Sequence, residues 1–252
     1  MPLPHAHLSL ARACLPYLDV DDPQAYYLAS FLPDARYYLR LSRSSTHFYY
    51  RYTRPVLQPF AVSRSFWLGY TVHLILDFYW YSAHGRFIYA RRLPRWLKIP
   101  PVRRFAMDMA FEWYCSQEQP VTPVLPADIA ELTPSVRRIL DRLHASADDF
   151  QQMMDALRQY TASGEMLDLL PLIEHYSPLM RARTTLLIRP LLRALRASPR
   201  MQGYMRQTLP ASAAYFELLR DGVLRTIQHE ARHIAYRPAS IYTPDTAQAV
   251  TR

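Results

Sequence analysis

Glycine is the residue whose scarcity most limits the folds open to this chain. Only 5 of the 252 residues are glycine, whereas 21 are proline. Tight β-hairpins need positive φ angles that glycine adopts most readily, so a chain with so few glycines is a poor candidate for an all-β fold. No G-x-G-x-x-G or G-x-x-x-x-G-K stretch occurs, which argues against dinucleotide-binding and P-loop chemistry.

Apolar residues recur at intervals of three and four along most of the chain, which is the period of an amphipathic helix. Pro33 is expected to end or bend the second helix, and Ser65 to cap the third. The sequence therefore predicts an all-α fold. The expected helices cover residues 4–18, 23–32, 65–82, 102–116, 134–161, 165–176, 178–197 and 211–235.

Two features suggest how these helices are grouped. The segment 119–134 contains four prolines and is the best candidate for a linker. Residues 34–64 are rich in tyrosine and are expected to form loop and short helix. We therefore expect a metal-binding helical half over residues 1–120 and a second helical half over residues 121–252, packed into the same domain.

The chain is basic, with a formal charge of +9, and its basic residues are arginines apart from Lys98. A positive field favours anionic partners such as phosphate esters, lipid headgroups or nucleic acid. A solvated arginine surface explains the charge equally well. Cys14 and Cys115 are the only cysteines, too few for a disulfide framework or a four-thiolate zinc site.

The sequence favours a cytoplasmic location without a transmembrane segment. Its first residues lack the basic stretch and sustained apolar run of a signal peptide. No stretch reaches the ~18 uncharged apolar residues of a membrane span. The most apolar window, residues 66–81, contains both His73 and Asp77.

His73 and Asp77 are the first candidates for chemistry. Residues four apart on a helix project from the same face, so an imidazole and a carboxylate at this spacing can hold one divalent cation. Gly69, one turn earlier on that face, leaves room for a second helix or a ligand. Taken alone, the pair is better explained by a buried His–Asp hydrogen bond. Four more potential ligands near expected helix ends favour metal: His5, His7, Asp34 and His47.

These residues occur within four short motifs of residues 1–80, in a definite order. The motifs are M-P-x-P-x-x-H, P-D, T-H-F and F-x-x-G-Y-x-x-H-x-x-x-D-x-x-W. Their specified positions here are Met1, Pro2, Pro4, His7, Pro33, Asp34, Thr46, His47, Phe48, Phe66, Gly69, Tyr70, His73, Asp77 and Trp80. In this order the motifs resemble the zinc-dependent phospholipase C family, whose relatives include single-strand nucleases of fungi and plants.

The resemblance implies a phospholipase C-like helical bundle with one to three zinc ions in a cleft between helices. It further implies cleavage of a phosphate ester through a metal-activated water. Asp34, His47, His73 and Asp77 would bind metal, His7 would bind a neighbouring metal, and Asp34 would also act as general base. The implied substrate is a phosphate ester, including a phospholipid headgroup; no motif supports nucleic acid. Tyrosine-rich runs could hold a cationic headgroup by cation–π contact.

The sequence departs from the family pattern downstream, where a second ligand cluster is expected. Only His84, Asp108 and Glu112 are candidates there, so the site is expected to hold fewer than three metals. Asp108 and Glu112 are four apart on an apolar helix. A helix edge that faces solvent or pairs with arginines explains them at least as well.

A rival motif, H-E-x-x-H, is formed by His229, Glu230 and His233 and is typical of zinc metallopeptidases. Asp245 is the only carboxylate downstream that could supply a third ligand. We therefore interpret the motif as a solvated helix face, as we do the isolated His144 and His175. Two alternatives to the phosphoesterase stay open: a non-catalytic helical protein with a residual structural metal site, and this metallopeptidase.

Overall fold

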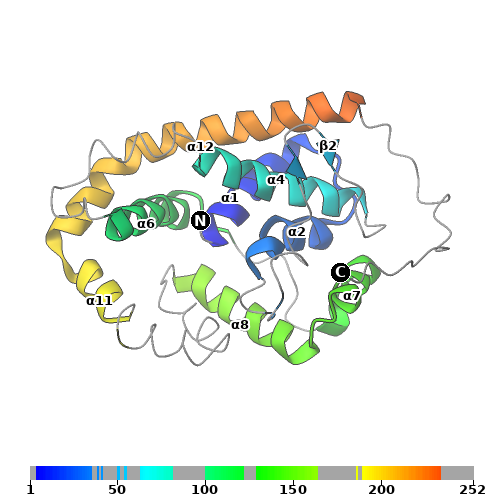
Figure 1. Ribbon diagram of the computed structural model, residues 1–252, viewed down its shortest axis with the longest axis horizontal. Helices are drawn as coiled ribbons and strands as arrows, with labels where there is room; N and C mark the ends of the chain where they lie inside the picture. The colour runs from blue at the N-terminus through cyan, green and yellow to red at the C-terminus, as the bar shows by residue number, and fades with distance from the viewer. Residues whose placement is uncertain are drawn as a thin grey trace, which may run out of the picture.

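The computed structural model describes residues 4–35, 39, 41, 50–51, 54–55, 63–81, 100–121, 129–163, 186 and 189–233. The described part is all-α, as expected (Figure 1). Its helices are α1 (Pro4–Cys14), α2 (Pro23–Ala35), α4 (Arg64–Tyr81), α6 (Pro100–Glu118), α7 (Pro134–Leu143), α8 (Ala147–Ser163), α11 (Arg189–Ala197) and α12 (Pro199–His233). Short 3₁₀ helices cover Leu15–Tyr17 and Ile129–Glu131.

Within the region expected to be loop and short helix, the described residues include a minimal strand pair. β1 (Tyr50–Arg51) and β2 (Arg54–Pro55) are antiparallel, with Tyr50 opposite Pro55 and Arg51 opposite Arg54. Strands of only two residues each are too short to cover a core, so this pair does not alter the fold class.

Helix α4 carries the predicted His–Asp pair and is buried along most of its length. Leu68, Val72, Ile75 and Leu76 are all buried, as the sequence predicts. The prediction that Ser65 caps this helix is wrong. The Ser63 hydroxyl accepts from the Phe66 amide at 3.2 Å, so Ser63 satisfies one of the free N–H groups at the helix start.

Ser65 lies inside the helix and has another role. Its hydroxyl accepts hydrogen bonds from the amides of Asp21 and Asp22, at 3.0 and 2.9 Å. Those residues immediately precede α2, and the Asp22 carboxylate caps α2 by accepting from the Ala25 amide at 3.0 Å. Ser65 thus fixes the start of α2 against the start of α4.

Helices α2 and α4 come into direct backbone contact at Gly69, and they pack more extensively than any other pair of described helices. A Cβ added to Gly69 would lie 2.0 Å from the carbonyl oxygen of Tyr26. The Tyr26 hydroxyl in turn donates to the carbonyl of Ala11 in α1 at 2.7 Å. The absence of a side chain at Gly69 therefore lets three helices meet around Tyr26, which confirms the predicted close approach.

Pro33 does not end α2, which continues to Ala35. A proline removes one backbone hydrogen bond. The lost bond and the ring contact involve the carbonyl one turn before Pro33, so the two residues after it can stay helical. Asp34 consequently belongs to the helix, and its orientation follows from the packing of α2.

Two boundaries in the second half differ from the predictions. The expected helix over 134–161 is two helices, because His144 adopts a left-handed conformation with φ 52° and ends α7. The next helix starts beyond Ser146, whose hydroxyl accepts from the Asp149 amide at 3.4 Å. The last helix begins at Pro199, well before residue 211, and Pro210 lies inside it.

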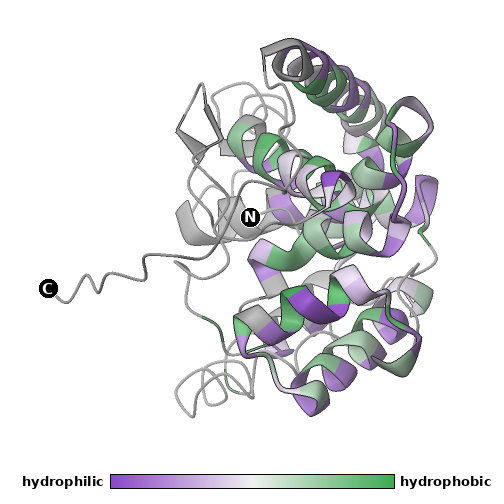
Figure 2. Ribbon diagram, turned by 90° about the vertical axis from the view of Figure 1, so that its right-hand side faces the viewer, coloured by the Kyte–Doolittle hydropathy of each residue, from purple (hydrophilic) through white to green (hydrophobic). Residues whose placement is uncertain are grey.

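The core lies where α1, α2, α4, α6 and α12 meet, with α12 running across α4 and α6 (Figure 1). The described helices carry both hydrophilic and hydrophobic residues along their length (Figure 2). The start of α2 is tied to the second half of the chain. Asp22 accepts from the Thr133 hydroxyl at 2.9 Å, and the Gln24 side chain accepts from the Thr133 amide at 2.8 Å.

Candidate metal centre

Helix α4 presents His73 and Asp77 on one face, as their spacing predicts. Nε2 of His73 lies 3.6 Å from Oδ2 of Asp77. The other ring nitrogen, Nδ1, lies 2.9 Å from the carbonyl oxygen of Ser30 in α2. Because a carbonyl can only accept, Nδ1 carries the proton of the neutral ring. Nε2 is then a lone-pair donor directed to the side of Asp77, as a metal-binding histidine requires.

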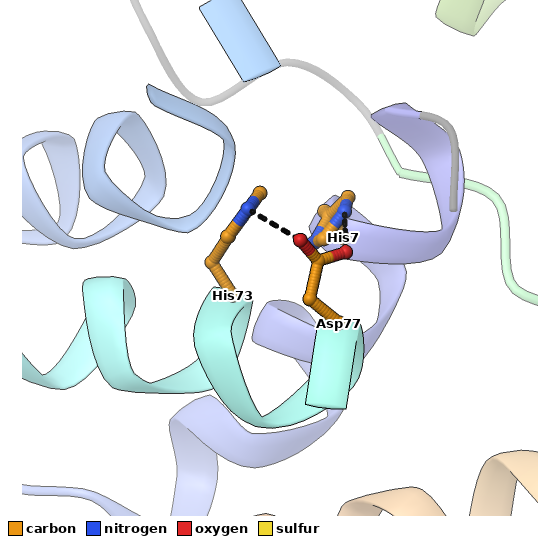
Figure 3. Close-up of side chains that lie close together, drawn as sticks. All are labelled: His7, His73 and Asp77. Carbon is orange, nitrogen blue, oxygen red and sulfur yellow. Dashed lines mark ion pairs between the residues drawn. The ribbon is translucent and has the colours of Figure 1, made fainter. Parts of the chain in front are cut away.

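Helix α1 brings His7 against this pair (Figure 3). The rings of His7 and His73 are stacked, with centroids 4.0 Å apart and planes 11° apart. Nε2 of His7 lies 3.9 Å from Oδ1 of Asp77, so each Asp77 oxygen faces one imidazole. The carboxylate thus lies beside the stacked pair, facing Nε2 of two histidines that come from different helices.

Asp34, at the end of α2, completes the cluster. Its Oδ2 lies 3.4 Å from Nε2 of His7. The two imidazoles are fully buried, whereas the Asp34 and Asp77 side chains are 10% and 16% exposed. Solvent therefore reaches the cluster from its carboxylate side.

The separations suit a shared cation better than direct hydrogen bonds. Distances of 3.4 to 3.9 Å exceed those of N–H···O bonds. Two ligands of a tetrahedral zinc ion, each at ~2.0–2.1 Å, are ~3.3 Å apart. Among the described residues, His7, His73 and Asp77 form a group whose ligand atoms all lie within 4.8 Å of one another.

Unsatisfied polar atoms give a second indication of a cation site. Within the described part of the chain, neither ring nitrogen of His7 has a hydrogen-bond partner. The same holds there for Oδ1 of Asp34 and Oδ1 of Asp77. Buried polar groups are normally satisfied, so nitrogen and carboxylate donors arranged in this way fit a zinc ion.

The charges of the cluster shift its pKa values in opposite directions. Burial lowers the pKa of His7, and the neighbouring His73 lowers it further. Burial also opposes protonation of His73, but the Asp77 and Asp34 carboxylates outweigh it and raise its pKa. Burial disfavours the Asp77 anion, yet His73 and His7 lower the pKa of Asp77 to about 2. At neutral pH the cluster therefore holds an anionic Asp77, which attracts a cation.

The remaining predicted ligands are placed as follows. His47 and His84 lie outside the described residues. Glu112 is buried in α6, and its carboxylate accepts from the backbone amides of His5 and Ala6, at 2.7 and 3.0 Å. Asp108 is half-buried one turn earlier in α6. Within the described residues, Asp108 and Glu112 are not part of a three-ligand group.

Two contributions to this region have no local sequence signal. The Ser30 carbonyl that orients His73 is a backbone group, so residue type does not reveal it. The hydroxyl of Tyr160 in α8 donates to Oε1 of Glu112. Burial raises the pKa of Glu112 to about 7, although this hydroxyl and the two amides lower it.

The H-E-x-x-H motif lies at the end of α12. His229 is exposed there, and the helix buries Tyr215, Leu219, Val223 and Ile227. The exposure of His229 agrees with the solvated helix face inferred from the sequence. Glu230 and His233 have no described side chains, and Asp245 and His175 lie outside the described residues.

Comparison with known proteins found a family that the region containing the cluster resembles. A family model described as "Zinc dependent phospholipase C" matches residues 6–117. This stretch is similar to the zinc-dependent phospholipase C family. The resemblance inferred from the motifs is thereby confirmed for helices α1 to α6, and the all-α fold agrees with it.

Residues 6–117, which match the family model, include His7, Asp34, His73 and Asp77. Tyr160, α7, α8, α11 and α12 lie beyond it. Neither the curated proteins nor the solved structures gave a match. Among the described helices, none is long and apolar enough to cross a membrane.

Proposed function

We propose that this protein is a zinc-dependent hydrolase of phosphate esters of the phospholipase C type. The observation that carries the proposal is the convergence of His7, Asp34, His73 and Asp77 from three helices, within the stretch that matches the family. His7, His73 and Asp77 are the primary ligands, and His47 and Asp34 add to them. A zinc ion held there would lower the pKa of a bound water and offset negative charge on the phosphate oxygens.

The chain's own residues have separate roles in this proposal. Asp77 faces Nε2 of both imidazoles with its two oxygens, so that one cation could contact all three side chains, and the Ser30 carbonyl keeps the His73 proton on Nδ1. Asp34 is partly exposed beside His7, so its carboxylate is positioned to accept a proton from water at the open side of the cluster. The substrate class is a phosphodiester, including phospholipid headgroups.

Metal content and turnover of the purified full chain test this proposal. We expect at least one equivalent of zinc after gel filtration without added metal. A chromogenic phosphocholine diester should be hydrolysed, with activity lost on chelation and restored by zinc. Phosphatidylcholine vesicles and single-stranded DNA, assayed in parallel, identify the preferred phosphodiester.

The alternatives give different results. Zinc without turnover of any of these three substrates would favour a residual structural site. Less than about a tenth of an equivalent of metal, in protein never exposed to chelator, would contradict the proposal. Chelator-sensitive cleavage of a peptide library that survives His73→Ala would indicate the metallopeptidase.

A further inference from the structure

Glu112 makes contacts that connect the candidate metal centre to the second half of the chain. Its buried carboxylate lies at the N-terminal end of α1, where it accepts from the amides of His5 and Ala6 at 2.7 and 3.0 Å. Oε1 also accepts the hydroxyl hydrogen of Tyr160 in α8. One side chain of α6 thus joins helices α1 and α8.

The start of α1 needs such a partner because the local sequence supplies none. The first turn of a helix has N–H groups with no partner inside the helix. They are usually satisfied by a polar residue that precedes the helix or by nearby acidic residues. Here Leu3 has no polar side chain, and the first turn of α1 contains no acidic residue. Glu112 provides the acceptor atoms.

The location of this contact makes it relevant to the metal centre. His7 is the residue directly after Ala6, and its Nε2 lies 3.4 and 3.9 Å from the carboxylates of Asp34 and Asp77. Other contacts between α1 and the end of α6 lie farther along α1. They join Ser9 to the Gln119 carbonyl and Arg12 to the Pro120 carbonyl, at 2.8 and 2.5 Å. Among these described hydrogen bonds, those to Glu112 are therefore the ones at the His7 end of the helix.

Tyr160 restrains Glu112 from the opposite side. It is fully buried, and its ring lies 4.7 Å from the ring of His5. It therefore contacts Glu112 through its hydroxyl and packs against the first turn of α1 through its ring. A hydrogen bond to a buried carboxylate restricts where that carboxylate can lie.

We infer that Glu112 is a positioning residue for the metal ligand His7, and that Tyr160 holds Glu112 in place. The inference rests on the proposed function, because it treats His7 as a ligand. It assigns to Glu112 a role other than metal ligand. It also makes the chain beyond residue 117, outside the family match, part of what aligns the centre.

The test compares Glu112→Gln and Tyr160→Phe with Thr133→Ala in the full chain. The first substitution keeps the shape of the side chain but places an amide donor opposite one of the two backbone donors. The second keeps the ring and removes only the hydroxyl. Thr133→Ala removes the cap of α7, and Thr133 bonds to the start of α2 rather than to α1, so this variant controls for a general loss of stability.

The first readout is zinc affinity, measured with a competing chelator, together with the Co²⁺ absorption spectrum. Outer-shell partners of metal ligands typically change affinity 10–100-fold. We expect Glu112→Gln to weaken zinc binding by ~10-fold or more and to alter the Co²⁺ spectrum. Tyr160→Phe should give a smaller change in the same direction, while Thr133→Ala stays within about twofold of the parent, a difference of ~0.4 kcal/mol.

The second readout needs no metal and therefore separates this inference from the proposed function. In chelated protein with labelled histidine, the His7 ring signals, assigned with His7→Ala, should move in Glu112→Gln and Tyr160→Phe but not in Thr133→Ala. A parent without metal would overturn the proposed function alone, and the ring signals would still decide whether Glu112 positions His7.

Two results would overturn the inference. The first is that Glu112→Gln and Tyr160→Phe melt like Thr133→Ala, keep the zinc affinity of the parent and leave the His7 signals unmoved. The contact between Glu112 and α1 would then be purely structural. Loss of one whole metal equivalent in Glu112→Gln, with the rest bound at the parent's affinity, would make Glu112 a ligand of a second ion. If Glu112→Gln does not fold, Tyr160→Phe alone decides by the same criteria.

Discussion

The imidazoles of His7 and His73 are stacked, with centroids 4.0 Å apart, although they come from helices α1 and α4. Two protonated rings at this distance would repel each other, and both burial and the neighbouring His73 lower the pKa of His7. The arrangement therefore favours at least one neutral ring, which is the form that binds metal. With the Asp77 carboxylate facing Nε2 of both rings, the three side chains are arranged to share a cation.

Removal of either α4 ligand should abolish zinc binding and phosphoesterase activity. We expect His73→Ala and Asp77→Asn each to weaken zinc binding by more than ~100-fold. In the proposed site each change removes a direct ligand, whose loss should exceed the 10–100-fold effect of an outer-shell partner. Elemental analysis and isothermal titration measure the loss. Variants that keep parental metal content and melt like the parent would show that the pair is not a metal site.

Zinc should stabilise the protein less as the medium becomes more acidic. In the metal-free protein, burial lowers the pKa of His73, but the Asp77 and Asp34 carboxylates raise it further than burial lowers it. The raised pKa contributes stability that is fully present below the unfolded pKa of histidine and is lost as the pH rises through the folded value. Zinc instead needs the neutral ring. The difference in Tm between zinc-loaded and chelated protein should therefore shrink from about pH 8 to about pH 5.5, across the ordinary range of histidine titration, as calorimetry measures. A difference that grows on acidification would contradict the assignment of His73.

Gly69→Ala should destabilise the protein although alanine favours helices. The added Cβ would meet the Tyr26 carbonyl at 2.0 Å, so α2 and α4 must move apart. Overpacking of this kind costs about 1–3 kcal/mol, which exceeds the ~1 kcal/mol gained in helix propensity. Because Ser30 and Asp34 belong to α2, zinc affinity should also fall. Denaturant unfolding and zinc titration provide the measurements.

Gly203→Ala is the matched control for that substitution. Gly203 lies in α12, and a Cβ there would have no heavy atom within 4 Å among the described residues. We expect this variant to be unchanged or more stable by up to ~1 kcal/mol, with parental zinc affinity. Equal destabilisation by the two substitutions would show that the contact at Tyr26 is not the cause.

His229→Ala should leave the chemistry unchanged. His229 is exposed on α12, and the buried stripe of that helix passes through other residues. We expect metal content and phosphodiester turnover within about twofold of the parent, equivalent to ~0.4 kcal/mol in the barrier. The variant also serves as a control for His73→Ala, since both remove a histidine from a helix. A loss of zinc in His229→Ala would instead direct attention to the H-E-x-x-H motif.

Local pattern predicted the all-α class and the relative placement of one pair of candidate residues. The helical period and the scarcity of glycine predicted the all-α class, and the i, i+4 spacing placed His73 and Asp77 on one face of α4. These features depend on residues within a few positions of one another, where helix geometry sets the arrangement. The order of the motifs further indicated the family that the match to residues 6–117 confirms.

Boundaries were predicted less well because several groups compete for each cap. Ser65 was predicted to cap α4, but Ser63 has that role, and Ser65 instead bonds to the start of α2. The break at His144 depends on a left-handed residue that is not glycine, which the apolar period does not reveal.

Only the tertiary structure determined how the ligands come together. His7 reaches Asp77 because α1 packs beside α4, and the backbone of α2 approaches α4 at Gly69. The bonds from Glu112 to His5 and from Tyr160 to Glu112 join positions far apart in the chain. A buried carboxylate accepts hydrogen bonds from the donors that the packed helices place near it. The identity of those donors follows from long-range packing and not from the sequence around any one residue.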